Sequence, residues 1–179
     1  MICIELCTFA QKKQMGIRWF TVIVILIAAV ITVSVVLRGN EDKREFTEKL
    51  EEDIRCCRML TYRDSFYDYT VNYPSFFEQV PDSLLDEPGS SLFRYWDNWV
   101  QIEMSARVLP LSAVQQHADT FIDSGQLRIN GSPIPDYLFH AKYIRKHKLW
   151  LVLMLTYPES CSQAVSRLIN EVESWKGVE

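Results

Sequence analysis

The stretch Trp99-Val-Gln-Ile-Glu-Met-Ser-Ala-Arg-Val108 decides the fold class of this chain. Apolar and polar side chains alternate along it, and a period of two predicts a β-strand with one buried face. The apolar positions are Val100, Ile102, Met104, Ala106 and Val108. Residues 92–96 precede it, and Asp97-Asn98 between the two segments tolerate the left-handed backbone of a tight turn. The two segments therefore predict an antiparallel hairpin.

A second predicted hairpin lies further along the chain, with strands over residues 137–144 and 149–157. Its tip is the basic run Arg145-Lys-His-Lys148. Residues 150–155 are apolar at every position, which is typical of a strand that is covered on both faces. We therefore expect this strand in the middle of the sheet.

Two helices are predicted, one before and one after this second hairpin. Ser112 is a typical N-cap and Gly125 a typical C-terminal stop for the first of them. Ser160 and Gln163 form a capping box that opens the last helix, which ends before Gly177. The apolar sides are Val114, His117, Ala118, Phe121 and Ile122 in the first helix, and Ala164, Val165, Leu168, Ile169, Val172 and Trp175 in the second.

A shorter alternation over residues 65–74 opens the domain and predicts a strand that ends at Pro74. Its apolar positions are Tyr67, Tyr69, Val71 and Tyr73. Residues 76–90 contain prolines and a glycine and are expected to be irregular. Together these elements predict an α+β domain, in which helices pack on an antiparallel sheet.

The N-terminal region contains an apolar run without charge, proline or glycine at residues 19–37. At about 1.5 Å per residue, a helix over this run matches the ~30 Å hydrocarbon core of a bilayer. We therefore predict a transmembrane helix over residues 17–37, with the lipid bilayer as its partner. A cleaved signal peptide is the alternative, but its apolar region is usually only about 7 to 15 residues long. An uncleaved anchor is favoured.

The span divides the chain into four predicted regions. These are a tail over residues 1–16, the transmembrane helix over 17–37, a juxtamembrane helix or stalk over 38–60 and the α+β domain over 61–179. In the third region Phe46, Leu50, Ile54 and Cys57 recur at helical spacing and form one stripe. This segment is either a stalk above the bilayer or the first helix of the domain.

Composition and motifs argue against several classes of function. The net charge of −4 leaves no basic surface for nucleic acid, so no nucleic-acid partner is expected. The chain has no nucleophile elbow, phosphate-binding loop or metalloprotease motif. Its three histidines lie outside any metal-ligand spacing. We expect neither an enzyme nor a bound metal or cofactor, with a hydrolase of unrecognised type as a lesser alternative.

Two groups of side chains are candidates for partner recognition. Aromatic residues crowd the first hairpin and the loop before it, and a tight turn is expected to leave some of them exposed. The basic tip of the second hairpin is suited to anionic lipid headgroups or an acidic partner. The candidates are Phe76, Phe77, Trp96, Trp99, Arg145, Lys146 and Lys148. Each group also has a structural interpretation, as a covered sheet face and as a solvated turn.

Five cysteines lie on the two sides of the predicted span, with Cys3 and Cys7 before it and Cys56, Cys57 and Cys161 after it. In an oxidising compartment, a bridge from Cys161 to Cys56 or Cys57 would tie the last helix to the segment after the span. Buried free thiols are equally compatible with the sequence.

The order of these elements resembles the PsbP-like family over about residues 65–176. The resemblance lies in Tyr69-x-Val71-x-Tyr73-Pro74-x-Phe76 at the start and Leu155-Thr-Tyr-Pro158 before a closing helix with Trp175. Members include the extrinsic PsbP subunit of photosystem II and, by fold, a small nuclear-transport factor that binds a Ran-type GTPase. The resemblance implies a central antiparallel sheet between helices and a non-enzymatic adaptor or envelope role. The uncleaved anchor and the missing lumen-targeting signal depart from the photosynthetic members.

Basic residues flank the predicted span equally, so charge alone does not orient it. A short tail rarely crosses, and the resemblance is to extracytoplasmic proteins. We therefore expect an extracytoplasmic domain, which is periplasmic in a Gram-negative bacterium. The expected function is a membrane-anchored, non-enzymatic binding or adaptor module for an unknown envelope protein. The alternative is a domain that binds a small apolar ligand or lipid beneath the aromatic hairpin.

Overall fold

The computed structural model describes residues 24–35, 38, 45–97 and 100–177. The chain divides into two units, one ending at Phe46 and the other comprising Thr47–Glu179. The strands of the second unit are β1 (Met59–Asp64), β2 (Tyr69–Pro74), β3 (Glu78–Gln79), β4 (Ser91–Trp96), β5 (Gln101–Pro110), β6 (Thr120–Ile129), β7 (Ser132–Lys146) and β8 (Leu149–Pro158). Its helical elements are residues 47–56 of a helix described over residues 45–56, the helix α2 (Ser166–Ser174) and three short 3-10 turns. The turns are η1 (Asp82–Leu84), η2 (Leu111–Ala113) and η3 (Glu159–Cys161).

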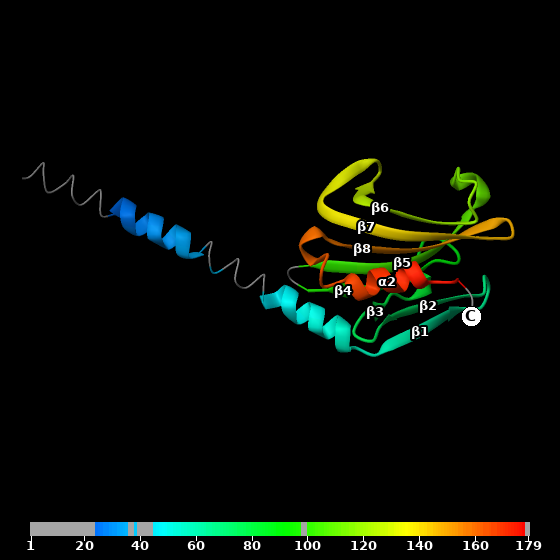
Figure 1. Cartoon of the computed structure of the whole chain (residues 1–179), viewed down its shortest axis with the longest axis horizontal. Helices are drawn as coiled ribbons and strands as arrows, with labels where there is room; N and C mark the ends of the chain where they lie inside the picture. Colours follow the sequence, from blue (N-terminus) through cyan, green and yellow to red (C-terminus); the bar gives the residue numbers. More distant parts are fainter. Residues whose placement is uncertain (1–23, 36–37, 39–44, 98–99, 178–179) are drawn as a thin grey trace, which may run out of the picture. The chain divides into compact units, whose positions relative to one another are not determined.

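Six of the strands form one antiparallel sheet in the order β3-β4-β5-β8-β7-β6, while β1 and β2 form a separate ribbon (Figure 1). The fold is therefore α+β, with antiparallel sheets, as the sequence predicts. Both predicted hairpins are confirmed, because β4 pairs with β5 and β7 pairs with β8. The apolar strand β8 lies between β5 and β7 and is buried over most of its length, as expected.

The first face of the sheet is covered by the β1–β2 ribbon and α2. Phe93, Met104 and Leu155 lie side by side across three strands, and all three are fully buried. The ring of Tyr73 from β2 stacks on Phe93 at 4.1 Å between centroids. Beyond the end of α2, the indole Nε1 of Trp175 donates to the carbonyl of Thr70 at 2.5 Å. These contacts join β2, the sheet and the C-terminal segment into one core.

The helix that ends at residue 56 packs through apolar side chains and is hydrogen-bonded to Arg167 of α2. Leu50 and Ile54, two members of the predicted stripe, are buried. The Nη1 atom of Arg167 donates to the carbonyls of Ile54 at 2.6 Å, Arg55 at 2.9 Å and Cys57 at 3.2 Å. The last carbonyls of a helix have no partner within the helix, so a cation placed there satisfies them and complements the helix dipole.

The predicted helix from Ser112 to Gly125 is wrong. Residues 111–113 form only the 3-10 turn η2, and Thr120–Ile129 form β6, which pairs with β7. The apolar spacing of this segment fits a helix, but Thr120, Phe121 and Ile122 are residue types that favour strands. Pairing with β7 stacks Phe121 on Tyr143 at 4.4 Å, a contact that a helix would lack. Tertiary packing therefore overrides the local pattern.

The last helix begins later than its predicted capping box. Residues 159–161 form η3, and α2 starts at Ser166 without a side-chain cap from Ser160 or Gln163. The reason is the buried segment between them, since Cys161, Ala164 and Val165 all pack into the core. The predicted apolar side of this helix is confirmed at Leu168, Val172 and Trp175.

The strand predicted over residues 65–74 begins later, at Tyr69, and is preceded by a partner strand that the sequence did not predict. Residues 65–68 form the turn of the β1–β2 hairpin, in which Asp68 adopts a positive φ of 52°. The Asp64 side chain accepts hydrogen bonds from the backbone amides of Phe66 and Tyr67. The first two residues of β1, Met59 and Leu60, lie at the end of the segment that we predicted as a juxtamembrane helix or stalk.

The predicted transmembrane helix over residues 17–37 is described only at residues 24–35, which are helical. Residues 17–23 and 36–37, and the tail over residues 1–16, lie outside the described residues. Within the described ranges, no helix combines the length and the apolarity that crossing a bilayer requires.

Two tyrosines, the half-buried Tyr62 and the buried Tyr69, are expected to make the domain sensitive to alkali. Burial, followed by the Asp82 and Asp64 carboxylates, raises the pKa of Tyr62 to about 12, and burial also raises the pKa of Tyr69. Both folded-state pKa values exceed the value of about 10 for an unfolded tyrosine. Their contribution to stability is therefore complete below pH 10 and is lost as the pH rises through the folded pKa.

Urea unfolding at several pH values between 9 and 12 should show this loss. The Tyr62→Phe variant keeps the edge-on packing of the ring against Phe93 but has no ionisable hydroxyl. We expect its free energy of unfolding to fall less steeply with pH than that of the parent chain. Identical slopes for the two proteins would contradict the assignment.

Candidate functional site

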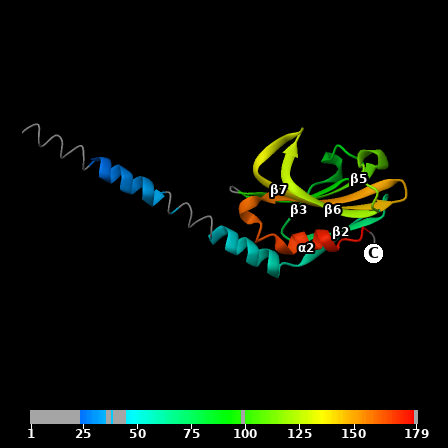
Figure 2. The same cartoon turned by 45° about the horizontal axis from the view of Figure 1, so that its top comes forward.

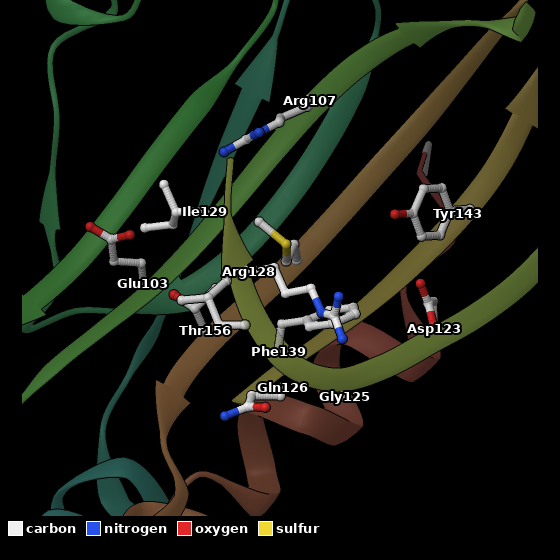
Figure 3. Close-up of a pocket in the computed structure, with 12 residues that line it drawn as sticks. Glu103, Arg107, Asp123, Gly125, Gln126, Arg128, Ile129, Phe139, Tyr143 and Thr156 are labelled. Carbon is white, nitrogen blue, oxygen red and sulfur yellow. The ribbon is translucent and has the colours of Figure 1, made fainter. Parts of the chain in front are cut away.

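The second face of the sheet carries a cavity of about 820 Å³ (Figure 3). Strands β5, β8, β7 and β6 all contribute to it. The lining residues are Glu103, Arg107, Asp123, Gly125, Gln126, Leu127, Arg128, Ile129, Phe139, Tyr143, Met154 and Thr156. In Figure 3, Glu103 and Ile129 lie on one side of the cavity and Asp123 and Tyr143 on the other.

The cavity exists because the β6–β7 hairpin bends out of the plane of the other strands (Figure 2). The pairing of β6 with β7 is regular up to Gln126 and then shifts before Arg128. Such an irregularity bends a strand and increases its twist. Asn130 and Gly131 at the hairpin tip both have positive φ values, 52° and 81°, as a two-residue turn requires. Residues 127–129 therefore stand over the sheet instead of continuing it.

The floor of the cavity is apolar. Phe139 and Tyr143 on β7 and Met154 on β8 point to this face of the sheet. Gly125 lies beside Phe139, and a Cβ placed on it would be 3.6 Å from the phenyl ring. Since the glycine has no side chain to cover that ring, the aromatic surface stays accessible from the cavity.

Charged side chains of both signs surround this floor, namely Glu103, Arg107, Asp123 and Arg128. Among the described residues, no salt bridge joins any two of the four. Burial and the nearby Asp123 carboxylate raise the pKa of the Tyr143 hydroxyl, while the Arg107 guanidinium opposes this shift. Tyr143 therefore stays protonated at neutral pH and is available as a hydrogen-bond donor.

A second cavity of about 300 Å³ continues from the first and shares Glu103, Leu127, Ile129 and Thr156 with it. It extends to Gln101 and to Ile134 and Tyr137 near the start of β7. We call the two together the trough. From Arg107 to Gln101 it runs for about 20 Å along β5, at ~3.4 Å per residue.

The structure separates the aromatic residues that the sequence grouped as a recognition site. Trp96 pairs directly with Gln101, so it lies on the trough side of the sheet, and 70% of its surface is exposed. Phe76 and Phe77 pack on Tyr95, which points to the opposite face, and Phe77 is buried. Trp99 lies outside the described residues.

The basic hairpin tip is only partly free. Lys146 donates to the carbonyls of Tyr67 at 3.2 Å and Asp68 at 2.9 Å, which ties the tip to the turn of the β1–β2 hairpin. Arg145 pairs with Asp119 at 3.5 Å. Lys148 is exposed. The ten-residue strand β5 spans about 30 Å, so this tip and Trp96 lie at opposite ends of the sheet.

The three cysteines of the domain carry free thiols. Cys57 donates to the carbonyl of Ile54 at 3.2 Å and lies 3.8 Å from the Arg167 guanidinium. Cys161 is fully buried, and this burial raises the pKa of its thiol. Neither alternative of the predicted bridge, from Cys161 to Cys56 or to Cys57, is formed in the structure.

Sequence reasoning missed the trough, because five of its residues, from Asp123 to Arg128, fall at the end of the wrongly predicted helix or just beyond it. One signal was available. Asn130-Gly131 is a strong hairpin turn motif, and the segments on its two sides contain β-branched and aromatic residues.

Comparisons with known proteins give a weak fold similarity. No family model matches the chain, and no curated protein sequence matches it significantly. The solution structure of cyanobacterial PsbP (CyanoP) from Synechocystis sp. PCC 6803 is similar with a TM-score of 0.43 and 12% identity, over 66% of this chain and 91% of that one. The chain thus resembles PsbP weakly, at the level of fold.

Proposed function

We propose that this chain is a membrane-tethered, non-enzymatic binding protein whose domain holds its partner in the trough. The trough is the observation that carries the proposal. It offers an uncovered aromatic floor next to charged side chains of both signs, a combination suited to recognition. Trp96 at its end adds a large, exposed amphipathic side chain of the kind that dominates many interfaces.

The tether is supported by the apolar run at residues 19–37 and by the described part of its helix. The side chains over residues 24–35 are exposed in the chain by itself, including Ile25 and Val30. The two hydroxyl groups of this segment are already satisfied, since Thr32 donates to the carbonyl of Ala28 and Ser34 to that of Val30. A helix in lipid needs such internal partners for its polar groups.

In this proposal the short tail lies in the cytoplasm and the domain lies outside it. Anchoring both the domain and an envelope partner to one bilayer raises their effective concentration, so even a modest intrinsic affinity suffices for binding. The apolar floor of the trough also favours a second candidate function, binding of a small apolar ligand or lipid.

The tether is tested by placing charge in the span. Each Asp near the middle of a membrane helix costs about 2.5 to 3.5 kcal/mol, so the double variant Ile27→Asp/Ile31→Asp should leave membranes on carbonate washing. The parent chain and an Ile27→Leu/Ile31→Leu control should stay in the pellet. Release of the parent chain by the same wash would contradict the tether.

The trough is tested by site-directed photo-crosslinking in native membranes. A photoreactive amino acid at Gln126, which is exposed, should capture a partner that the same amino acid at Phe66 does not, because Phe66 is exposed on the β1–β2 turn, away from the trough. A Gly125→Val substitution should abolish the captured band. Equal capture from position 66, or a band that this substitution does not change, would contradict the trough as the binding site.

A further inference from the structure

We propose that the trough binds an extended peptide segment of a partner protein, which adds to the sheet as a strand along the free edge of β6. This inference rests on the proposed binding function and names the class of partner. Two observations support it: the hydrogen-bonding groups on the edge of β6, and the apolar and charged lining beside that edge.

β6 is the outermost strand of the sheet, and the hydrogen bond from the Arg145 amide to the Asp119 carbonyl at 2.8 Å sets the alternation of its pairing with β7. In an antiparallel pair, residues alternate between those that bond to the partner strand and those whose backbone groups point away. Asp119 bonds to β7, so the amide and carbonyl of Thr120, Ile122 and Ser124 point to the free edge.

This edge has few of the features that prevent strands from pairing. The regular segment of β6, residues 120–126, contains neither proline nor lysine, and 47% of the surface of Ile122 is exposed. Natural edge strands are usually blunted by such residues, by bulges or by a covering element. Here the irregular pairing starts only after Gln126, which leaves the preceding residues able to accept another strand.

Alternating donors and acceptors along the edge match a peptide backbone. A lipid or another apolar small molecule would contact the floor of the trough and leave these groups without partners. β-Strand addition uses the backbone for affinity and pockets for alternate side chains for specificity. The edge therefore favours a peptide over a lipid.

The residues of the trough then predict which side chains a bound peptide carries. Asp123 and Gly125 of β6 face the trough, so alternate residues of an added strand would face it too. An apolar side chain opposite Gly125 reaches the ring of Phe139 that the glycine leaves uncovered. The peptide residue opposite Asp123, two positions away, meets that carboxylate if it is basic. The expected ligand is a segment with an apolar residue and, two positions from it, a basic one.

The experiment uses the full chain in nanodiscs and a phage-displayed library of 12-residue peptides. Synthetic copies of the enriched peptides are labelled, and their affinities are measured by fluorescence anisotropy. Two variants test the two halves of the proposal. Gly125→Val fills the space above Phe139 with a side chain that the backbone tolerates, and Ser124→Pro removes one outward-pointing amide while leaving the pairing with β7 intact.

Ser124→Val is the matched control, because it keeps the amide and changes only a side chain on the other face of β6. We expect Gly125→Val and Ser124→Pro each to weaken peptide binding by at least about tenfold, and Ser124→Val to stay within about twofold of the parent chain. Unchanged thermal unfolding midpoints show that all three variants are folded. In the parent chain, the bound peptide should slow hydrogen exchange at the Ile122 and Ser124 amides.

Several outcomes overturn the inference. These are a library in which no peptide is enriched, peptide binding that Ser124→Pro does not change, and no added protection at Ile122 or Ser124. Two further results would replace the peptide by another occupant. A lipid that co-purifies with the parent chain and is lost from Gly125→Val would indicate a lipid site, and a dimer that only Ser124→Pro disrupts would indicate a second copy of this chain. If a crosslinked partner is then still lost on Gly125→Val, the proposed binding function stands and only the peptide inference fails.

Discussion

Replacing Phe93 by alanine is expected to destabilise the domain by about 3 to 5 kcal/mol, the usual range for deleting a buried phenyl ring. Phe93 is fully buried, with Tyr73 stacked on it at 4.1 Å and Tyr62 packed edge-on at 5.6 Å. The substitution removes the contact surface between the β1–β2 ribbon and the sheet and leaves a cavity there. Small domains have only about 5 to 15 kcal/mol of stability in total, so the loss is a large share of it.

Urea unfolding of the full chain in detergent, followed by circular dichroism, measures this loss. Phe66→Ala is the control, because Phe66 is 83% exposed on the β1–β2 turn, and its free energy of unfolding should change by less than about 0.5 kcal/mol. A loss below about 1 kcal/mol for Phe93→Ala would show that the ribbon does not depend on this contact.

Replacing Arg167 by methionine is expected to cost about 2 to 3 kcal/mol, because hydrogen bonds from a charged donor are worth more than neutral ones. Methionine keeps the apolar stem but cannot donate to the carbonyls of Ile54, Arg55 and Cys57. Without the guanidinium, the last carbonyls of the helix over residues 45–56 lose their partner on α2, and the helix depends more on the burial of Leu50 and Ile54. We expect this helix to detach before the rest of the domain unfolds.

Two measurements separate the effect of Arg167 from a general loss of charge. Hydrogen exchange should become faster at residues 50–57 in Arg167→Met and change little in β5 and β8. Arg63→Met is the matched control, since Arg63 pairs with Asp68 on the surface, and exposed pairs contribute about 0.2 to 1 kcal/mol. Equal losses in the two variants, or uniform exchange over the domain, would argue against a specific role for Arg167 at the helix end.

The sequence by itself determined most of the sheet. The alternation in residues 100–108 and the uniformly apolar run at 150–155 predicted β5 and β8 correctly, because in a strand the identity of each side chain reports directly which face is buried. The apolar side of the last helix was also predicted correctly from the spacing of its residues. These features depend on local periodicity and hold whichever partners surround them.

Only the tertiary structure determined that the chain between η2 and β7 forms the strand β6. The apolar spacing from Val114 to Ile122 suits a helix as well as a strand, and the stacking of Phe121 on Tyr143, from a residue twenty-two positions later, selects the strand. The bend of the β6–β7 hairpin then creates the trough. Because the trough is lined by side chains from four strands, no single stretch of sequence contains it, and it exists only once the strands are paired.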